Sequence, residues 1–566
     1  MKSSAPAQLD VSHIESLQAD DYDGRVQPKA IVVVMAINFI YFAHIVNVVG
    51  AGALATNIVS VIGGSGSTVW FASAITIATV VLCPPVSQAA DYWGRKWLLV
   101  VLTVCGGVGA IIVSRAESIG VAIAGFTIGG ISYGAQSILY AVVSEVLPRK
   151  YRSWAQASVQ VTGSAGGVVG LLVGGALVVA HPTSGFRTYF YIDAGIYFLA
   201  AIICAMFYNP PLRELQRLNL REKLRALDWV GYALLTIGLV LFCIGLSWSQ
   251  NPYSWRDAHV LAPFVVGVLG AIAFIAYEYF KKDGMVHRKL FQDRNFAIAL
   301  GCLFVEGLVF FSVNNYFAFE VIILFQKDAF QAGLHFSMVF FALVVSSLLS
   351  GVYVAHQKSI RFPAVVAATL FLAFYIAMAT VNTSTPIRNL WAYPILIGLG
   401  LGMYIVVLVT AAQFAAPPEL ISTSSGLTTS VRSLGGTIGL AINNAIVNSA
   451  LSAHLGPKVA GATLPLGLPA SSLGDLIPGL LAGDPAALAA VPGVTPEILG
   501  AGGLAVRETF VIAFRNVWIA AAAFIVVALV ASLFLRDHKD DFSCHIDAPI
   551  QVPTRTEVVE KQIVSL

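Results

Sequence analysis

The sequence predicts an all-α integral membrane protein. Of its 566 residues, 57% are hydrophobic and only 11% are charged, and a water-soluble chain of this length cannot bury so many apolar side chains. The apolar residues form recurring runs of about 20, the length that a helix needs to cross the hydrocarbon core of a bilayer. The alternation of apolar and polar residues that membrane barrels require is absent.

Fourteen apolar runs define the predicted membrane spans. The tenth run is the least regular, because Ser346, Ser347 and Ser350 interrupt it. In chain order, the spans cover residues 29–51, 67–89, 97–114, 119–142, 155–180, 187–208, 228–249, 259–280, 296–320, 334–355, 362–381, 390–413, 425–450 and 510–535.

The basic residues of the short loops set the predicted orientation. Loops on one side of the spans carry most of the Lys and Arg, whereas loops on the other side carry about one each. Since basic loops stay in the cytoplasm, the first side is predicted to be cytoplasmic, and the even number of spans places both termini there. The first 28 residues lack the features of a secretory signal peptide.

Two segments between the spans differ from the other connecting loops in composition or length. Residues 212–227 space leucines between basic residues, which favours an amphipathic helix on the cytoplasmic leaflet, although a plain charged linker remains an alternative. Residues 451–509 form one long outer segment. Its many prolines, Pro496 among them, break it too often for a further span, so short surface helices are expected there.

An internal repeat relates the two halves of the chain. A shift of 269 residues lays the segment that starts at Pro148 on the segment that starts at Pro417, and it aligns a Gly-Gly-x-x-Gly run in each. Such repeats are typical of transporters whose substrate site lies between the halves. The glycines suit close helix packing, either at a static contact or at a moving interface: Gly163, Gly167, Gly170 and Gly174 in the first copy, and Gly435, Gly436 and Gly439 in the second.

The segment DYWGRKW, residues 91–97, lies in the predicted cytoplasmic loop between the second and third spans. Asp91 can accept hydrogen bonds from an arginine, Gly94 permits a tight turn, and Arg95 and Lys96 face the anionic inner leaflet. The segment is therefore interpreted as a polar latch between helix ends. Simple anchoring by the basic pair would not need the acid.

The Asp-x-x-Gly-Arg-Lys pattern resembles that of the major facilitator superfamily. LDWVGYALL (227–235) and VRSLGGTIGLAI (431–442) resemble its fourteen-spanner drug:proton antiporters. EVLPRKYR (145–152), FVEGLVFF (304–311) and AFRNVWI (513–519) resemble the fungal trichothecene efflux pumps and their siderophore-transporter relatives. The chain departs from antiporters in two places, because the fifth span lacks their proline and the fourth span lacks their intramembrane arginine.

The resemblance implies a major facilitator fold with two six-helix bundles and two extra central spans. The expected parts are a cytoplasmic tail over 1–28, a bundle over 29–208, a linker with the extra spans over 209–292, a bundle over 293–537 that includes the outer segment, and a cytoplasmic tail over 538–566.

Glu306 is the most unexpected residue of the ninth span. It is predicted to lie about 15 Å into the bilayer, where a charge costs on the order of 3 kcal/mol or more. Burial favours the neutral, proton-carrying form of a carboxyl group, so Glu306 is predicted to couple transport to protons. The alternative is a protonated acid that only bonds a neighbouring helix. Asp193 and His44 are weaker candidates for proton coupling.

Further polar residues within the spans are candidates for other roles, with ordinary packing as the alternative for each. Arg432 is expected to find an acidic or carbonyl partner and to act in structure or gating. Candidates for the substrate cavity are Tyr133, Gln136, Tyr140, Asn314, Asn315, Asn443 and Asn444.

The expected function is proton-driven export of small, largely apolar compounds, with import of iron–siderophore chelates as the alternative. A receptor on the same scaffold would not need Glu306. No Walker A, HExxH or paired CxxC motif occurs, so neither ATP hydrolysis, a cofactor nor a metal is indicated. The net charge of +3 does not indicate nucleic-acid binding. We expect a monomer in contact with lipid, in the plasma membrane or alternatively the vacuolar membrane.

Overall fold

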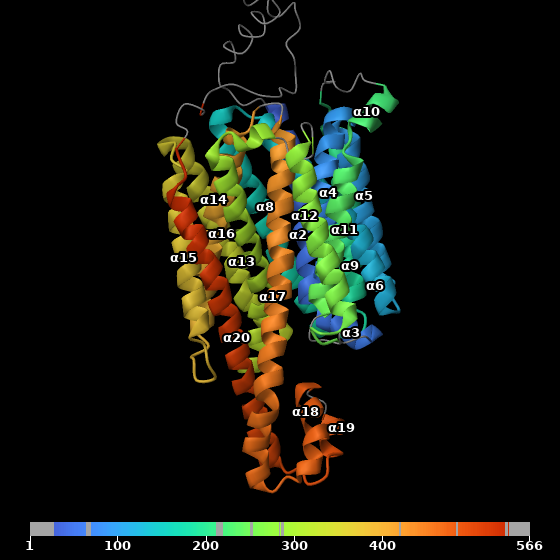
Figure 1. The fold of residues 1–566 in the computed structure, drawn as a ribbon, viewed down its shortest axis with the longest axis vertical. Coiled ribbons are helices and arrows are strands. Elements are labelled where there is room, and N and C mark those ends of the chain that lie inside the picture. The colour runs from blue at the N-terminus through green and yellow to red at the C-terminus, as the bar shows by residue number, and fades with distance from the viewer. Residues whose placement is uncertain are drawn as a thin grey trace, which may run out of the picture.

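The computed structural model describes residues 28–63, 69–210, 219–248, 253–281, 284, 288–417, 420–482, 485–537 and 542. Within these residues every regular element is a helix. Thirteen helical stretches are long and apolar enough to cross a membrane. The long helix α17 (Ile421–Thr463) runs beside them (Figure 1) and makes the fourteenth, although its many Ser, Thr, Gly and Asn residues lower its hydropathy. The predicted fold class is confirmed.

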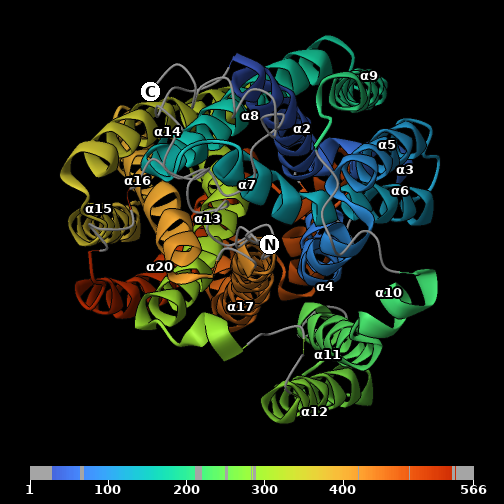
Figure 2. The ribbon, with the colours of Figure 1, turned by 90° about the horizontal axis from the view of Figure 1, so that it is seen from above.

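The helices of the first half gather on one side of the molecule (Figure 2). The fourth span is interrupted near its middle by a 3₁₀ turn, η2, and the short helix α3 follows α2. The helices are α2 (Pro28–Ala53), α3 (Ala55–Ile62), α4 (Val69–Trp93), α5 (Arg95–Ser114), α6 (Ile119–Ile131), η2 (Ser132–Ala135), α7 (Gln136–Glu145), η3 (Arg149–Tyr151), α8 (Arg152–Ala180) and α9 (Gly185–Phe207).

The helices of the second half gather on the opposite side (Figure 2). These helices pack around α13. Helix α13 lies next to α17, on the side of this group that faces the first half. Besides α17, the helices are η5 (Arg288–Phe291), α13 (Arg294–Phe325), α14 (Ala329–Gln357), α15 (Arg361–Ala379), α16 (Asn389–Ala415) and α20 (Pro496–Leu533).

The two extra helices, α11 (Trp229–Trp248) and α12 (Ala258–Phe280), pack on each other at the edge of the molecule, next to α4 and α17 (Figure 2). The short helix α10 (Leu220–Ala226) precedes them. Its start is fixed by a capping box, in which Asn219 and Glu222 satisfy each other's backbone amides. Thus α10 covers only the end of the predicted amphipathic segment 212–227, and residues 211–218 lie outside the described part of the chain.

Two helix pairs make the most extensive contacts between the halves, α8 with α14 and α4 with α17. Gly167 of α8 leaves room for the ring of Phe340 on α14, because a Cβ there would overlap it. The other three predicted packing glycines of α8 face the first half: Gly163 meets Tyr41, while Gly170 and Gly174 meet Tyr189.

The second glycine run lies at the contact between α17 and α13. Any Cβ on Gly435 or Gly436 would overlap Phe304 or Phe311, and one on Gly439 would lie 2.8 Å from Leu308. Small residues thus bring the backbones of these two helices together. This contact fixes the height and rotation of α17 against α13, on which the central site depends.

The helices of the last two predicted spans are longer than those spans. Instead of ending near 450, α17 continues through Pro457 to Thr463, and α20 begins at Pro496 rather than near 510. Pro496 starts a helix because proline suits the first turn, where its missing amide is not needed. Both helices therefore extend well past the ends of the others, where the shorter α18 (Leu473–Ala482) and α19 (Pro485–Ala489) connect them (Figure 1).

Candidate functional site

Arg95 occupies the start of α5, at the end of the molecule opposite α18 and α19. Gly94 separates α4 from α5 with a φ of +90°, a conformation that side chains other than glycine rarely adopt. The sharp turn allows α5 to start immediately after α4 ends, and it points the Arg95 side chain inward, where it is buried. The neighbouring Lys96 points elsewhere, donating from Nζ to Asn209 over 2.6 Å.

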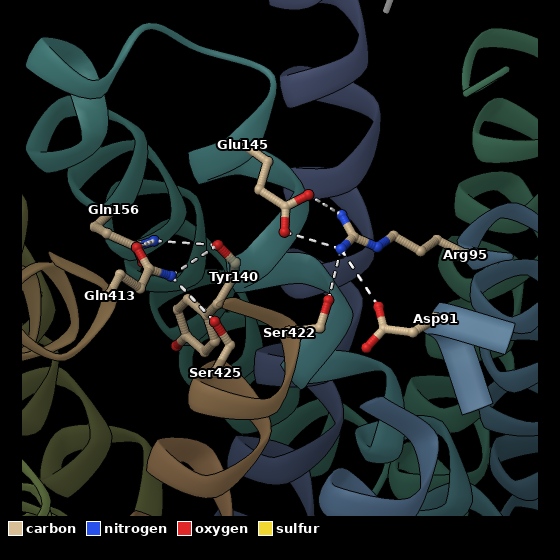
Figure 3. Close-up of polar contacts among 8 residues, drawn as sticks. All are labelled: Asp91, Arg95, Tyr140, Glu145, Gln156, Gln413, Ser422 and Ser425. Carbon is tan, nitrogen blue, oxygen red and sulfur yellow. Dashed lines mark hydrogen bonds and ion pairs between the residues drawn. The ribbon is translucent and has the colours of Figure 1, made fainter. Parts of the chain in front are cut away.

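The Arg95 guanidinium joins the two halves (Figure 3). It forms a two-pronged ion pair with Glu145 at the end of α7, with 2.8 Å between Nη2 and Oε1. The same Nη2 donates to the Ser422 hydroxyl at the start of α17, over 2.6 Å. Asp91 lies 3.8 Å away on α4. These contacts are centred on Arg95, and the bond across the halves runs to Ser422.

A second cluster, centred on Gln413, crosses the halves beside Arg95 (Figure 3). Gln413 of α16 accepts from Ser144 over 2.7 Å and donates to the Tyr140 carbonyl over 3.2 Å. Gln156 of α8 donates to Ser144 over 2.6 Å. Arg152 donates to the Gln413 carbonyl and lies over the ring of Phe414. Together the two clusters close the molecule between its halves at this end.

The central site is the ion pair between Glu306 of α13 and Arg432 of α17. Both prongs of the Arg432 guanidinium reach the carboxylate, with 3.0 Å between Nη2 and Oε1. Glu306 lies about 18 Å from the start of α13, and Arg432 lies about 17 Å from the start of α17, so the pair sits near mid-membrane. Glu306 is fully buried, whereas the Arg432 side chain is 15% exposed.

Aromatic groups of both halves lie near this pair. Phe310 lies under the Arg432 guanidinium at 5.2 Å. From the first half, Tyr41 and Tyr140 lie within electrostatic range of Arg432. Their hydroxyl groups share a hydrogen bond of 3.1 Å. A guanidinium that lies over an aromatic ring can bind flat or anionic organic groups.

The other two predicted proton sites lie together inside the first half. Asp193 is fully buried, and its Oδ2 accepts from Asn47 over 2.7 Å. Its Oδ1 has no hydrogen-bond partner among the described residues. His44 is also fully buried, and its ring stacks on Tyr133 at 4.6 Å between centroids. These groups are distant in sequence from Glu306 and belong to a different helix group.

The remaining residues predicted for the substrate cavity do not share one site, because their contacts lie in different parts of the molecule. Tyr133 donates to the His44 carbonyl, and Gln136 is buried on α7. Asn443 donates to Ser312 over 2.6 Å, which fixes α17 against α13. Asn315 donates back to its own helix, whereas the Asn314 amide approaches Gly52 of α2 across the halves. Asn444 is half-buried. Of the seven, only Tyr140 lies beside Arg432 in these contacts.

Sequence reasoning missed several of the residues that bring the halves together. Glu145, Ser422, Gln156 and Gln413 lie near helix ends, where polar residues are common, so their composition gave no signal. Glu320 is a further buried acid that was not proposed as a site, and it accepts from Trp518 over 2.8 Å. Within the described chain no cluster of three or more His, Cys, Asp or Glu could hold a metal ion.

A family model described as the fungal trichothecene efflux pump matches residues 12–564. Among curated proteins, the chain is 24% identical over 505 residues to the trichothecene efflux pump TRI12 of Fusarium sporotrichioides, covering 85% of this chain and 81% of that protein. It is 26% identical over 399 residues to the MFS-type transporter ucsD of an Acremonium species, covering 69% of this chain and 66%, just under two thirds, of that protein.

Solved transporters share the fold at low sequence identity. A bacterial homologue of the human lysosomal transporter Spinster aligns with a TM-score of 0.54 and 16% identity, over 90% of this chain and 98% of that one. The proton:xylose symporter XylE aligns with a TM-score of 0.54 and 12% identity, over 92% and 97%. The resemblance inferred from the motifs is confirmed.

Proposed function

The chain belongs to the fungal trichothecene efflux pump family of the major facilitator superfamily, and on that premise we propose that it exports small, largely apolar secondary metabolites by proton-coupled alternating access. It is a multi-pass membrane transporter and not an enzyme. The family description favours export over the alternative of siderophore import. Relatives named as efflux transporters, such as pyiT of Pyricularia grisea at 26% identity, support the same direction.

The observation that carries this proposal is the Glu306–Arg432 pair. It lies near mid-membrane, on the side of the second half that faces Tyr41 and Tyr140 of the first. Two opposite charges there are tolerated because each compensates the other. For export, the proton and the cargo must compete. A proton on Glu306 would cancel its charge and weaken the hold of the Glu306–Arg432 pair on the cargo, so that binding one would favour release of the other.

Besides a central site, alternating access requires that the transporter is closed at one end. The clusters around Arg95 and Gln413 would provide this closed end. Both lie at the end that the basic loops assign to the cytoplasm, so the described conformation has its halves joined on that side. We place the termini on that side and the chain in the plasma membrane as a monomer. Asp193, which accepts from the uncharged Asn47 and forms no ion pair within the described residues, is the next candidate for proton binding.

Export is tested in toxin-sensitive yeast that express the chain, with growth measured on a trichothecene and, separately, under iron starvation. The proposal predicts better growth on the toxin and no change with iron. In inside-out vesicles, a pH gradient should drive uptake of the same toxin, and a protonophore should abolish it. Improved growth under iron starvation without toxin resistance would contradict the proposed direction.

A further inference from the structure

The internal repeat is visible in the helices that meet at the closed end. Helix α8 begins at Arg152 and helix α17 begins at Ile421, which is 269 residues later. The same shift relates the two glycine runs of the sequence. It therefore makes Ser144 the repeat equivalent of Gln413, and Gln156 the repeat equivalent of Ser425. All four side chains are buried.

Each half holds its glutamine against its own serine. In the first half, Gln156 Nε2 donates to Ser144 Oγ over 2.6 Å. In the second half, Gln413 Nε2 donates to Ser425 Oγ over 3.1 Å. The two residue types have exchanged places between the repeats, yet each pair spans twelve positions. Each amide is therefore held in position by its own half.

Three further bonds join the halves through the same amides. Ser144 Oγ donates to Gln413 Oε1 over 2.7 Å, and Gln156 Nε2 donates to that same oxygen over 3.3 Å. Gln413 Nε2 donates to the Tyr140 carbonyl over 3.2 Å (Figure 3). These bonds involve no charged group. They are separate from the ion pair of Arg95.

The contact is not fully satisfied. Gln156 Oε1 is buried and has no hydrogen-bond partner among the described residues. A buried acceptor without a partner favours any conformation that exposes it to water. The closed contact thus contains three hydrogen bonds that favour closure and one unpartnered oxygen, Gln156 Oε1, that favours opening.

We propose that Gln156 and Gln413 form a reversible clasp that sets the balance between the closed and open states of this end. On opening, the three bonds across the halves break, Gln156 Oε1 becomes hydrated, and each glutamine keeps its own serine. The inference rests on the proposed alternating access. It assigns to the two glutamines a positioning role in gating that does not depend on protonation.

The test measures the distance between the halves without any cargo. Spin labels on unnatural amino acids at positions 150 and 361 report the closed end in the full-length protein by double electron–electron resonance in nanodiscs. Gln413→Leu should raise the ratio of open to closed molecules about five- to tenfold, the effect of losing roughly one net hydrogen bond. Gln156→Leu removes one bond across the halves and also the unpartnered Oε1 that favours opening, so its shift should be smaller than that of Gln413→Leu.

The matched control is Thr428→Val. Thr428 is buried on α17 but bonds only to carbonyl groups of its own helix, so its loss should leave the ratio unchanged. No shift in the two glutamine variants, or an equal shift in the control, overturns the clasp. If wild type and every variant show one fixed distance at all pH values, alternating access itself fails, and this outcome is distinguishable from failure of the clasp alone.

Discussion

Arg432 of α17 and Glu306 of α13 form a two-pronged ion pair near mid-membrane, and the close contact of Gly435 with the backbone of Phe304 holds their helices at the spacing that the pair requires. The pair explains how a carboxylate can lie fully buried within an otherwise apolar span. It also means that the two residues should behave as one unit under substitution.

The first prediction concerns this unit. Arg432→Gln leaves the Glu306 charge without its partner and should lower the free energy of unfolding by about 3–5 kcal/mol. Adding Glu306→Gln should recover most of that loss, because no uncompensated charge remains. Thermal unfolding of the purified single and double variants measures both. A double variant as unstable as Arg432→Gln alone would contradict the pairing.

The second prediction concerns the charged latch. Arg95→Gln removes the ion pair with Glu145 and weakens the bond to Ser422, so transport per molecule in the membrane should fall at least about tenfold, beyond any loss of protein that the broken buried pair causes. Asp91→Asn should also reduce transport, by less. Lys96→Gln is the control, since Lys96 bonds Asn209 within the same half. Toxin resistance and surface expression measure the three variants. Equal losses of transport in all three variants would contradict the latch and leave membrane anchoring as the role of this segment.

The third prediction is a pH dependence at the extra helix pair. Asp228 precedes α11, and its Oδ1 accepts from Lys281 over 2.6 Å and from the Gly231 amide over 3.0 Å. Burial acts to raise the pKa of Asp228, but these hydrogen bonds outweigh it and hold the pKa below its ordinary value. The carboxylate therefore stabilises the fold above the unfolded-state pKa of about 3.9, and this contribution is lost as the pH falls through the lower folded-state pKa.

Asp228→Asn should accordingly lower the free energy of unfolding by about 1–2 kcal/mol at pH 7. The difference from wild type should shrink as the pH is lowered from 5 toward 3. Chemical unfolding at a series of pH values measures it. A difference that is constant over this range would show that the Asp228 charge does not contribute.

The fourth prediction concerns topology. A peptide tag inserted after Gly493, between α19 and α20, should bind antibody on intact cells, because the basic loops place this end outside. Tags at either terminus should bind only after permeabilisation. Antibody binding to a terminal tag on intact cells would mean that the proposed orientation is inverted.

The sequence predicted the helices better than their ends. Hydropathy reports which residues need lipid, so it located the spans, but it could not report that α17 continues to Thr463 once its side chains leave the hydrocarbon. Proline does not end every helix, contrary to the expectation from the sequence. Pro457 lies inside a helix, and Pro496 begins one.

The sequence predicts individual residues of the site but not the contacts between them. Glu306 and Arg432 stood out because charges are costly in apolar runs. Their pairing did not stand out, because they are 126 residues apart and meet only through the rotation of two helices. Gln413 and Ser144 are related by the repeat shift itself, so the repeat carried a signal for that contact that went unused.

The measurement that tests the central claim most directly is pH-driven uptake by Glu306→Gln. In inside-out vesicles, this variant should lose gradient-driven uptake of the toxin but keep exchange of the toxin at equal pH, because glutamine preserves the shape and cannot ionise. Glu306→Asp should keep part of the driven uptake. If Glu306→Gln matches wild type in driven uptake, Glu306 does not couple protons, and Asp193 and His44 become the candidates.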